Sequence, residues 1–151
     1  MAEQNRKVAR VLVFGVFDGI HSGHRSMLRE AKTYGGYLVV ALAPDEIVRR
    51  LKGHLPRRSF VERKKDLLAL GEVNEVLEGD NSLGSWEVLD RAQPDVIAFG
   101  YDQQRLALSL REHLRGAATP QIVVLAAHDP HRCHSSILAK ENAARETRRQ
   151  S

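Results

Sequence analysis

Two histidines near the start of the chain have the residue type and spacing to bind a phosphate. His21 and His24 lie in the stretch FGVFDGIHSGH, residues 14–24. Residues three apart in the first turn of a helix project on the same side, so the two imidazoles could both donate hydrogen bonds to phosphate oxygens. Such bonds strengthen as a phosphoryl centre gains charge, which stabilises a transition state electrostatically.

Glycines in the same stretch allow a ligand to come close. Gly15 and Gly19 let the backbone turn, and Gly23 permits close approach. The helix expected to begin here offers unpaired N–H groups and the positive end of its dipole to an anion. A zinc site is the poorer interpretation, because two histidines with no third ligand nearby do not make one. We therefore predict phosphate binding; the alternative is a glycine-rich connection with two solvated histidines.

Strands and helices alternate along the chain and would position this loop. Apolar runs predict strands, and apolar residues at helical spacing predict helices. The expected strands are residues 8–14, 37–43, 73–77, 95–99 and 121–127. The expected helices are one through Met27 and Ala31 that stops at Gly35, then 44–51, 59–70, 83–92, one through Leu106 and Leu114, and 137–148. Ser59 and Glu62 form a capping-box pattern at the start of the third helix.

This alternation predicts an α/β fold: a single Rossmann-like, doubly wound domain with a mainly parallel sheet of about five strands. We expect the domain to span residues 1–151, with a core at 8–140 and a basic helical tail at 141–151. Ligands of such sheets bind at the carboxyl ends of the strands. The loops to search therefore follow Phe14, Ala43, Phe99 and Ala127.

Composition narrows the class of protein further. The chain has 151 residues, of which 42% are hydrophobic, and no apolar run of membrane-spanning length. Its one cysteine, Cys133, fits a reducing compartment, so we expect a cytoplasmic protein without membrane association. The formal charge of +4 favours anionic partners. Aromatic residues make up only 5% of the chain, so nucleic acid is the weaker prediction.

The stretch GVFDGIHSGH, residues 15–24, resembles the GxFDxxHxGH motif of the cytidylyltransferase-like nucleotidylyltransferases. RLKG at 50–53, ERK at 62–64 and PDVIAFGYDQ at 94–103 are also similar to the family. The last stretch resembles the GYDQ stretch of archaeal-type FAD synthases. The family also includes glycerol-3-phosphate cytidylyltransferases and heptose-phosphate adenylyltransferases.

The resemblance implies that His21 and His24 are catalytic: they hold a nucleoside triphosphate while an acceptor phosphate attacks its α-phosphorus and pyrophosphate leaves. It also implies further nucleotide-binding residues in the first and third loops. These are Phe14, Gly15, Val16, Phe17, Gly23, Gly100, Tyr101 and Asp102. Many relatives have threonine in place of Val16. For Asp102, the alternative role is a helix N-cap.

The acceptor side is expected around two cations. Lys52, in the RLKG stretch, could act catalytically on the acceptor phosphate or the triphosphate; the alternative is a solvated lysine. Arg63 matches the arginine of the family's ER pair and could reach the acceptor, or it could pair with Glu62 or Asp66. The arginines at 57–58 precede it on a loop that could close over substrate.

The fourth loop, HDPHRCHSSIL, spans residues 128–138. Ser135 and Ser136 match the last two hydroxyls of a Ser/Thr-rich segment that clasps the β- and γ-phosphates in relatives, whereas His134 replaces the first hydroxyl. Some relatives carry arginine where this chain has Asp129. A zinc cluster is the weaker interpretation of the loop, because so dense a run strains tetrahedral geometry. Its members would be His128, His131, Cys133 and His134.

The function implied is transfer of a nucleoside monophosphate to a phosphorylated acceptor. FAD synthesis from FMN and ATP is the leading prediction. The alternatives are a cytidylyltransferase that uses CTP and glycerol 3-phosphate or a similar phosphate, a heptose-phosphate adenylyltransferase, and a catalytically silent nucleotide-binding module. Mg²⁺ is the expected cofactor, because triphosphate chemistry normally needs a bridging cation; no protein ligand for it is predicted. A homodimer is an open expectation.

Overall fold

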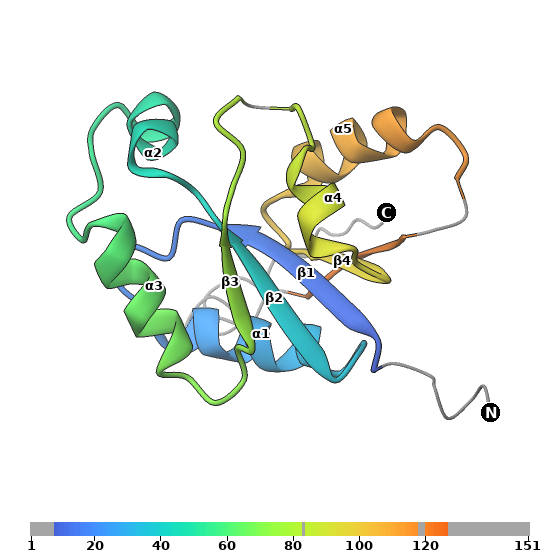
Figure 1. Cartoon of the computed structure of the whole chain (residues 1–151), viewed down its shortest axis with the longest axis horizontal. Helices are drawn as coiled ribbons and strands as arrows, with labels where there is room; N and C mark the ends of the chain where they lie inside the picture. Colours follow the sequence, from blue (N-terminus) through green and yellow to red (C-terminus); the bar gives the residue numbers. More distant parts are fainter. Residues whose placement is uncertain (1–7, 83, 118–119, 127–151) are drawn as a thin grey trace, which may run out of the picture.

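The computed structural model describes residues 8–82, 84–117 and 120–126. Five strands form one sheet in the order β3-β2-β1-β4-β5, and all neighbouring pairs are parallel. The strands are β1 (Arg10–Gly15), β2 (Tyr37–Leu42), β3 (Glu75–Glu78), β4 (Val96–Phe99) and β5 (Gln121–Val124). The chain builds the sheet outward from β1 first on one side and then on the other (Figure 1). This is the predicted doubly wound, Rossmann-like sheet.

The strands are apolar because both faces of the sheet are covered. Neighbouring residues of β1 point to opposite faces: Val11 and Val13 belong to one buried cluster and Leu12 to the other. Leu28 and Leu67 also belong to the first cluster. The sheet is therefore sandwiched between two helical layers around two cores.

Five helices make these layers. They are α1 (Ser22–Lys32), α2 (Asp45–Lys52), α3 (Phe60–Leu68), α4 (Val88–Ala92) and α5 (Gln104–Leu114). Helices α1 and α3 supply the helical residues of the first cluster, and α4 and α5 those of the second. Helix α2 follows the carboxyl end of β2 and lies beyond that edge of the sheet (Figure 1).

The start of α3 confirms the predicted capping box. The backbone N–H of Glu62 donates to the Ser59 hydroxyl at 3.2 Å, and the Ser59 N–H donates to the Glu62 carboxylate at 2.9 Å. These reciprocal bonds satisfy two donors that a helix start leaves unpaired.

The helix expected at 83–92 is shorter than predicted, since α4 begins only at Val88. Trp86 has a φ of 58°, in the left-handed region, which stops the helix from extending further back. The Trp86 indole is buried and meets the Phe14 ring edge-on at 5.5 Å. Tertiary packing therefore overrides the local helical pattern. The helix expected at 137–148 lies outside the described residues.

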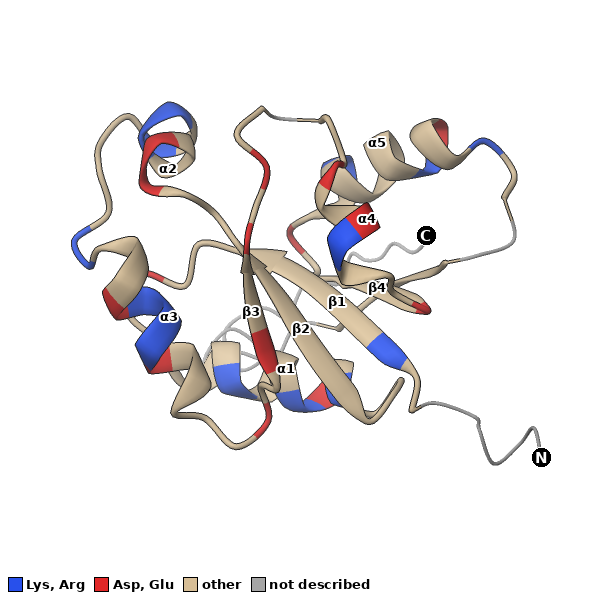
Figure 2. Cartoon of the chain, viewed as in Figure 1, with Lys and Arg blue, Asp and Glu red and all other residues tan. Residues whose placement is uncertain are grey.

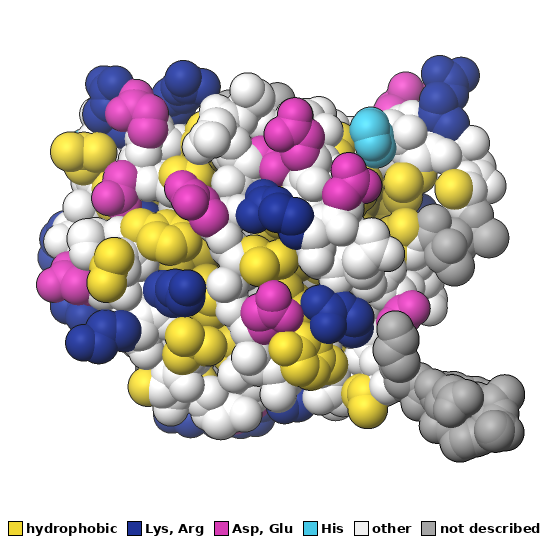
Figure 3. Space-filling model, in the orientation of Figure 1, with side chains coloured by type: hydrophobic (Ala, Val, Ile, Leu, Met, Phe, Trp, Pro, Cys, Tyr) yellow, Lys and Arg dark blue, Asp and Glu magenta, His cyan; other side chains and the backbone are white. Residues whose placement is uncertain are grey.

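Charged residues lie mostly on the helices and loops, and the central strands are almost free of them (Figure 2). On the face in Figure 3, lysines and arginines are mixed with aspartates and glutamates. That face therefore offers no continuous basic patch of the kind that tracks a nucleic-acid backbone. Within the described ranges, no helix has the length and apolar character needed to cross a membrane.

Candidate functional site

The predicted site residues of the first and third loops lie at the carboxyl ends of β1 and β4, where the winding of the sheet reverses. Strands β1 and β4 are direct neighbours, yet β1 leads into α1 on one face and β4 leads into α5 on the other. A crevice at such a switch point is where doubly wound sheets bind ligands. The loops after Phe14, Ala43 and Phe99 lie at this edge, as predicted; the fourth loop lies outside the described residues.

His21 and His24 form a capping box at the start of α1. His21 is the N-cap, and its Nδ1 accepts hydrogen bonds from the backbone N–H of Gly23 at 3.1 Å and of His24 at 3.3 Å. In return, the His24 Nδ1 accepts from the His21 N–H at 3.2 Å. A neutral imidazole that accepts at Nδ1 carries its proton at Nε2. This hydrogen-bond pattern therefore assigns both rings a tautomer whose Nε2–H is left for a ligand.

The two rings are stacked, with centroids 3.7 Å apart and planes 18° from parallel. Burial, and the repulsion that would arise between two protonated neighbouring imidazoles, lower the pKa of His24 from 6.5 to about 4, although the negative charge of Asp102 acts in the opposite direction. His24 is therefore neutral near pH 7. It acts on an anion as a hydrogen-bond donor rather than as a full positive charge.

Phe17 packs against His24. Its buried ring meets the His24 ring at 5.2 Å, with the planes at 63°. The backbone of Phe17 has a φ of 50°, which bulky residues rarely adopt. Gly15 makes room for this ring, because a Cβ there would lie 2.4 Å from a Phe17 ring carbon. Only glycine at position 15 lets Phe17 lie beneath His24.

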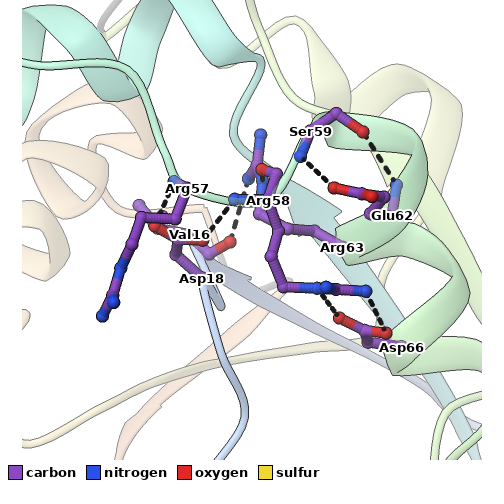
Figure 4. Close-up of polar contacts among 8 residues, drawn as sticks. All are labelled: Val16, Asp18, Arg57, Arg58, Ser59, Glu62, Arg63 and Asp66. Atoms are coloured by element: carbon purple, nitrogen blue, oxygen red, sulfur yellow. Dashed lines mark hydrogen bonds and ion pairs between the residues drawn. The ribbon is translucent and has the colours of Figure 1, made fainter.

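Asp18, in the same loop, holds the segment that precedes α3 (Figure 4). Its carboxylate accepts from the backbone N–H of Arg57 at 2.8 Å and of Arg58 at 2.9 Å. The Arg58 side chain in turn donates to both oxygens of Asp66, at 2.6 and 3.1 Å. The arginines at 57–58 thus lie on a segment tied to the histidine loop.

Arg63 is fully buried, with 0% of its surface exposed. Its guanidinium donates to the Val16 carbonyl at 2.9 Å, to the Arg58 carbonyl at 3.0 Å and to the Asp45 carboxylate at 2.6 Å. The alternative pairing with Glu62 or Asp66 is therefore wrong: Glu62 caps α3, and Asp66 binds Arg58. The guanidinium joins the β1 loop, the start of α2 and the segment before α3.

Lys52 is exposed at the last position of α2. The start of that helix, at Asp45, is tied to Arg63, so Lys52 lies roughly 10 Å further along the helix, at 1.5 Å per residue. The fold brings α2 to the site edge but leaves Lys52 at the distal end of the helix.

The third loop is braced by a residue that sequence reasoning did not single out. The Gln103 side-chain amide donates to the Phe14 carbonyl at 3.0 Å, and its oxygen accepts from the Gly100 N–H at 2.8 Å. Gln103 therefore clamps the ends of β1 and β4 together. It is also the N-cap residue of α5, without a side-chain cap bond, so the N-cap alternative for Asp102 is wrong. Asp102 is exposed.

Asp18 and Asp45 were also missed as functional residues. Asp18 belongs to the GVFDGIHSGH motif, and its place there could have suggested a role in the site. In the sequence, Asp45 is only an acidic residue in the first turn of an expected helix, so nothing local indicates its pairing with Arg63.

Ser135, Ser136 and the zinc alternative in the fourth loop lie beyond the last described residue. Among the residues that the structure describes, no group of three or more His, Cys, Asp and Glu side chains could hold a metal ion.

Comparison with known proteins identifies the family. The family model described as Cytidylyltransferase-like matches residues 12–141. FAD synthase of Thermococcus kodakarensis is 43% identical over 113 residues, which cover 75% of this chain and 76% of that one. FAD synthase of Ferroglobus placidus is 37% identical over 131 residues, covering 84% and 83%. The chain belongs to the cytidylyltransferase-like family and is a nucleotidyltransferase.

Solved structures agree with the fold. A lipopolysaccharide core biosynthesis protein from Thermoplasma volcanium is 30% identical, with a TM-score of 0.71, and the match covers 82% of this chain and all of that one. A pantothenate synthetase from Thermus thermophilus has a TM-score of 0.53 at 18% identity, covering 91% of this chain and 65% of that one. The second likeness is one of fold alone.

Proposed function

We propose that this nucleotidyltransferase is an FMN adenylyltransferase, which makes FAD from ATP and FMN. The names of relatives at 36–43% identity support this substrate pair. The observation that carries the chemistry is the histidine capping box, because it leaves two Nε2–H donors at a helix start on the switch-point edge. That arrangement suits a triphosphate.

In the proposed reaction, a phosphate oxygen of FMN attacks the α-phosphorus of ATP. A new P–O bond joins the two phosphates, the bond from the α-phosphorus to the bridging oxygen breaks, and pyrophosphate leaves with that electron pair. His21 and His24 donate hydrogen bonds from Nε2 to the triphosphate oxygens as negative charge develops. Because these donors are held by the helix backbone, little reorganisation is needed during the step.

The other nucleotide contacts remain proposals. The ends of β1 and β4, the loops that follow them and the first turn of α1 would supply contacts from Phe14, Gly15, Val16, Phe17, Gly23, Gly100 and Tyr101. The exposed Asp102 carboxylate would accept from a ribose hydroxyl or the base amino group. Ser135 and Ser136 would clasp the β- and γ-phosphates, as the family motif implies.

On the acceptor side, we keep Lys52 as a candidate cation, since it is exposed and has no ion pair with any described residue. We revise the role of Arg63. Its full burial and its three protein acceptors favour a brace for the loops over direct contact with the acceptor.

Mg²⁺ is proposed to arrive with the triphosphate. Mg²⁺ commonly keeps several waters and binds to substrate phosphates with few protein ligands. A set of protein ligands for the ion beside His21 and His24 is therefore not required. When bound, the ion would neutralise charge on the leaving phosphates.

A cytoplasmic location is supported by the single cysteine. A homodimer is proposed only from the family resemblance, and light scattering on the purified chain would test it.

The test is a product screen with purified protein and Mg²⁺. ATP and CTP are each offered with FMN, glycerol 3-phosphate and a heptose phosphate, and products are identified by mass spectrometry with pyrophosphate release. Riboflavin in place of FMN is the matched control, because it lacks the attacking phosphate. We expect FAD from ATP and FMN and no turnover with riboflavin. CDP-glycerol from CTP, or ATP binding without pyrophosphate release, would contradict the proposal.

A further inference from the structure

Two contacts tie the histidine loop to a segment 40 positions away in the sequence. The Asp18 carboxylate binds two consecutive backbone N–H groups, those of Arg57 and Arg58. Arg63 bridges the same two segments, because its guanidinium binds both the Val16 and the Arg58 carbonyls. Asp18 and Arg63 therefore both join the histidine loop to residues 57–58, and we call these two residues the loop clasp.

Asp18 is charged at neutral pH. Burial acts to raise its pKa, but the backbone N–H groups of Arg57 and Arg58 and the charges of Arg63 and Arg57 together lower it below its usual value. A charged carboxylate makes stronger hydrogen bonds to N–H groups than a neutral acceptor does. The hold on the segment is therefore present throughout the physiological range.

The clasp leaves one arginine side chain available. Arg58 is committed to Asp66, whereas the exposed Arg57 guanidinium has no hydrogen bond or ion pair to any described residue. In Figure 4 the Arg57 side chain extends away from the other labelled residues. The backbone N–H of Arg57 is bound by Asp18, and Asp18 lies three residues before His21 in the histidine loop. A cation at that place suits a phosphate that approaches the histidine-bound triphosphate.

We propose that Asp18 is a positioning residue that fixes Arg57 relative to the histidine pair, so that Arg57 can bind the phosphate of the acceptor. This proposal rests on the proposed function, in which the acceptor is FMN. Asp18 itself touches no substrate; it acts through the backbone of residues 57–58.

The kinetic test compares Asp18→Asn with Asp66→Asn. The first change replaces a carboxylate that accepts two N–H bonds with an amide that has one acceptor oxygen, whereas the second disturbs only the Arg58 side chain. In Asp18→Asn we expect KM for FMN to rise about 10-fold, as for loss of one charged hydrogen bond, with KM for ATP within about 3-fold of wild type. Asp66→Asn should keep both constants near wild type. Equal changes in both KM values, or no change in a folded Asp18→Asn protein, would overturn the proposal.

Arg57→Ala provides a second variant that leaves the clasp intact. It should reproduce the rise in KM for FMN without changing the backbone hold. A normal KM for FMN in this variant would overturn the role given to Arg57, and it remains informative even if Asp18→Asn does not fold.

Amide hydrogen exchange separates this proposal from the proposed function. In the wild type, the Arg57 and Arg58 amides should exchange slowly; in Asp18→Asn both should exchange at least about 10-fold faster, while Asp66→Asn leaves them protected. If the wild type makes no FAD but shows this pattern, the substrate assignment fails and the hold by Asp18 stands. Unchanged exchange in Asp18→Asn overturns the hold itself.

Discussion

Each histidine of the α1 capping box uses its two ring nitrogens differently. The Nδ1 atoms accept from the helix backbone, which fixes the rings and their tautomers. The Nε2–H groups are left to donate to a ligand. Structural and chemical roles therefore fall on different atoms of the same side chain, so substitutions can separate them.

Substitution of His21 by serine or alanine separates its role as helix N-cap from its role as hydrogen-bond donor to a ligand. Serine is a good N-cap and alanine is a poor one, but neither has an imidazole donor. We expect His21→Ala to lose about 1 kcal/mol of stability and His21→Ser much less. Both should lose about 10²–10³-fold in kcat. Urea unfolding and steady-state turnover measure the two effects. Near-normal turnover in His21→Ser would show that His21 only caps the helix.

The neutrality of His24 gives a pH prediction. The pKa of His24 is lowered from 6.5 to about 4 by burial and by the repulsion that would arise between two protonated neighbouring imidazoles. As the pH falls from 6.5 to 4, the unfolded chain binds a proton that the folded chain does not, so the free energy of unfolding falls in this window. Above pH 6.5 His24 contributes no pH dependence.

NMR titration of the His24 ring nitrogens measures this pKa and the tautomer directly. We expect an Nε2–H tautomer that persists to about pH 4. His24→Gln is the control for stability, because glutamine keeps a capping-box acceptor but does not titrate, so its stability should fall less between pH 6.5 and 4. A His24 pKa at or above 6, or a proton on Nδ1, would contradict the assignment.

At the scale of elements, the site depends on how α2 and α3 are joined to the β1 loop. Arg63 on α3 reaches the carbonyl of Val16 and the carboxylate of Asp45 at the start of α2. One buried cation therefore connects three segments. Its removal would leave two carbonyls, those of Val16 and Arg58, and the Asp45 carboxylate without their partner.

Arg63→Met tests whether this residue is a brace or an acceptor ligand. Because Asp45 is partly exposed, we expect a loss of about 2–3 kcal/mol, at or just below the range of about 3–5 kcal/mol for a broken buried ion pair. Lys64→Met, at the exposed neighbouring position, should change stability by less than about 0.5 kcal/mol. Urea unfolding of both variants gives the comparison. A fully stable Arg63→Met protein with a raised KM for FMN would restore the acceptor role.

The sequence predicted correctly those elements that depend on contacts between residues close together in the chain. The Ser59–Glu62 capping box depends on residues three apart, so the sequence alone was enough. The helix after the histidines was predicted as well, but the capping box that His21 and His24 form at its start was not. The helix expected at 83–92 was too long, because Trp86 packs against Phe14, which is distant in the chain. Two of the three partners of Arg63, Asp45 and Val16, lie 18 and 47 positions away, and no local pattern signals such contacts.

At the scale of the whole molecule, alternation of apolar strands and amphipathic helices was enough to predict a doubly wound parallel sheet. The switch point then follows from the strand order, since β1 and β4 are neighbours whose helices cover opposite faces. This placement gathers loops that are far apart in sequence at one edge. Gln103 could not be predicted as the clamp of that edge, because its role exists only once β1 and β4 are paired.

The central claim is that the two imidazoles stabilise the triphosphate more in the transition state than in the ground state. The most direct measurement is turnover and ATP affinity of the double variant His21→Ser/His24→Ala, which keeps a good N-cap. Loss of both donors should lower kcat for FAD formation by at least about 10³-fold, while the Kd for ATP, from the thermal shift on binding, changes by less than about 10-fold. Wild-type turnover in a folded double variant would contradict the account.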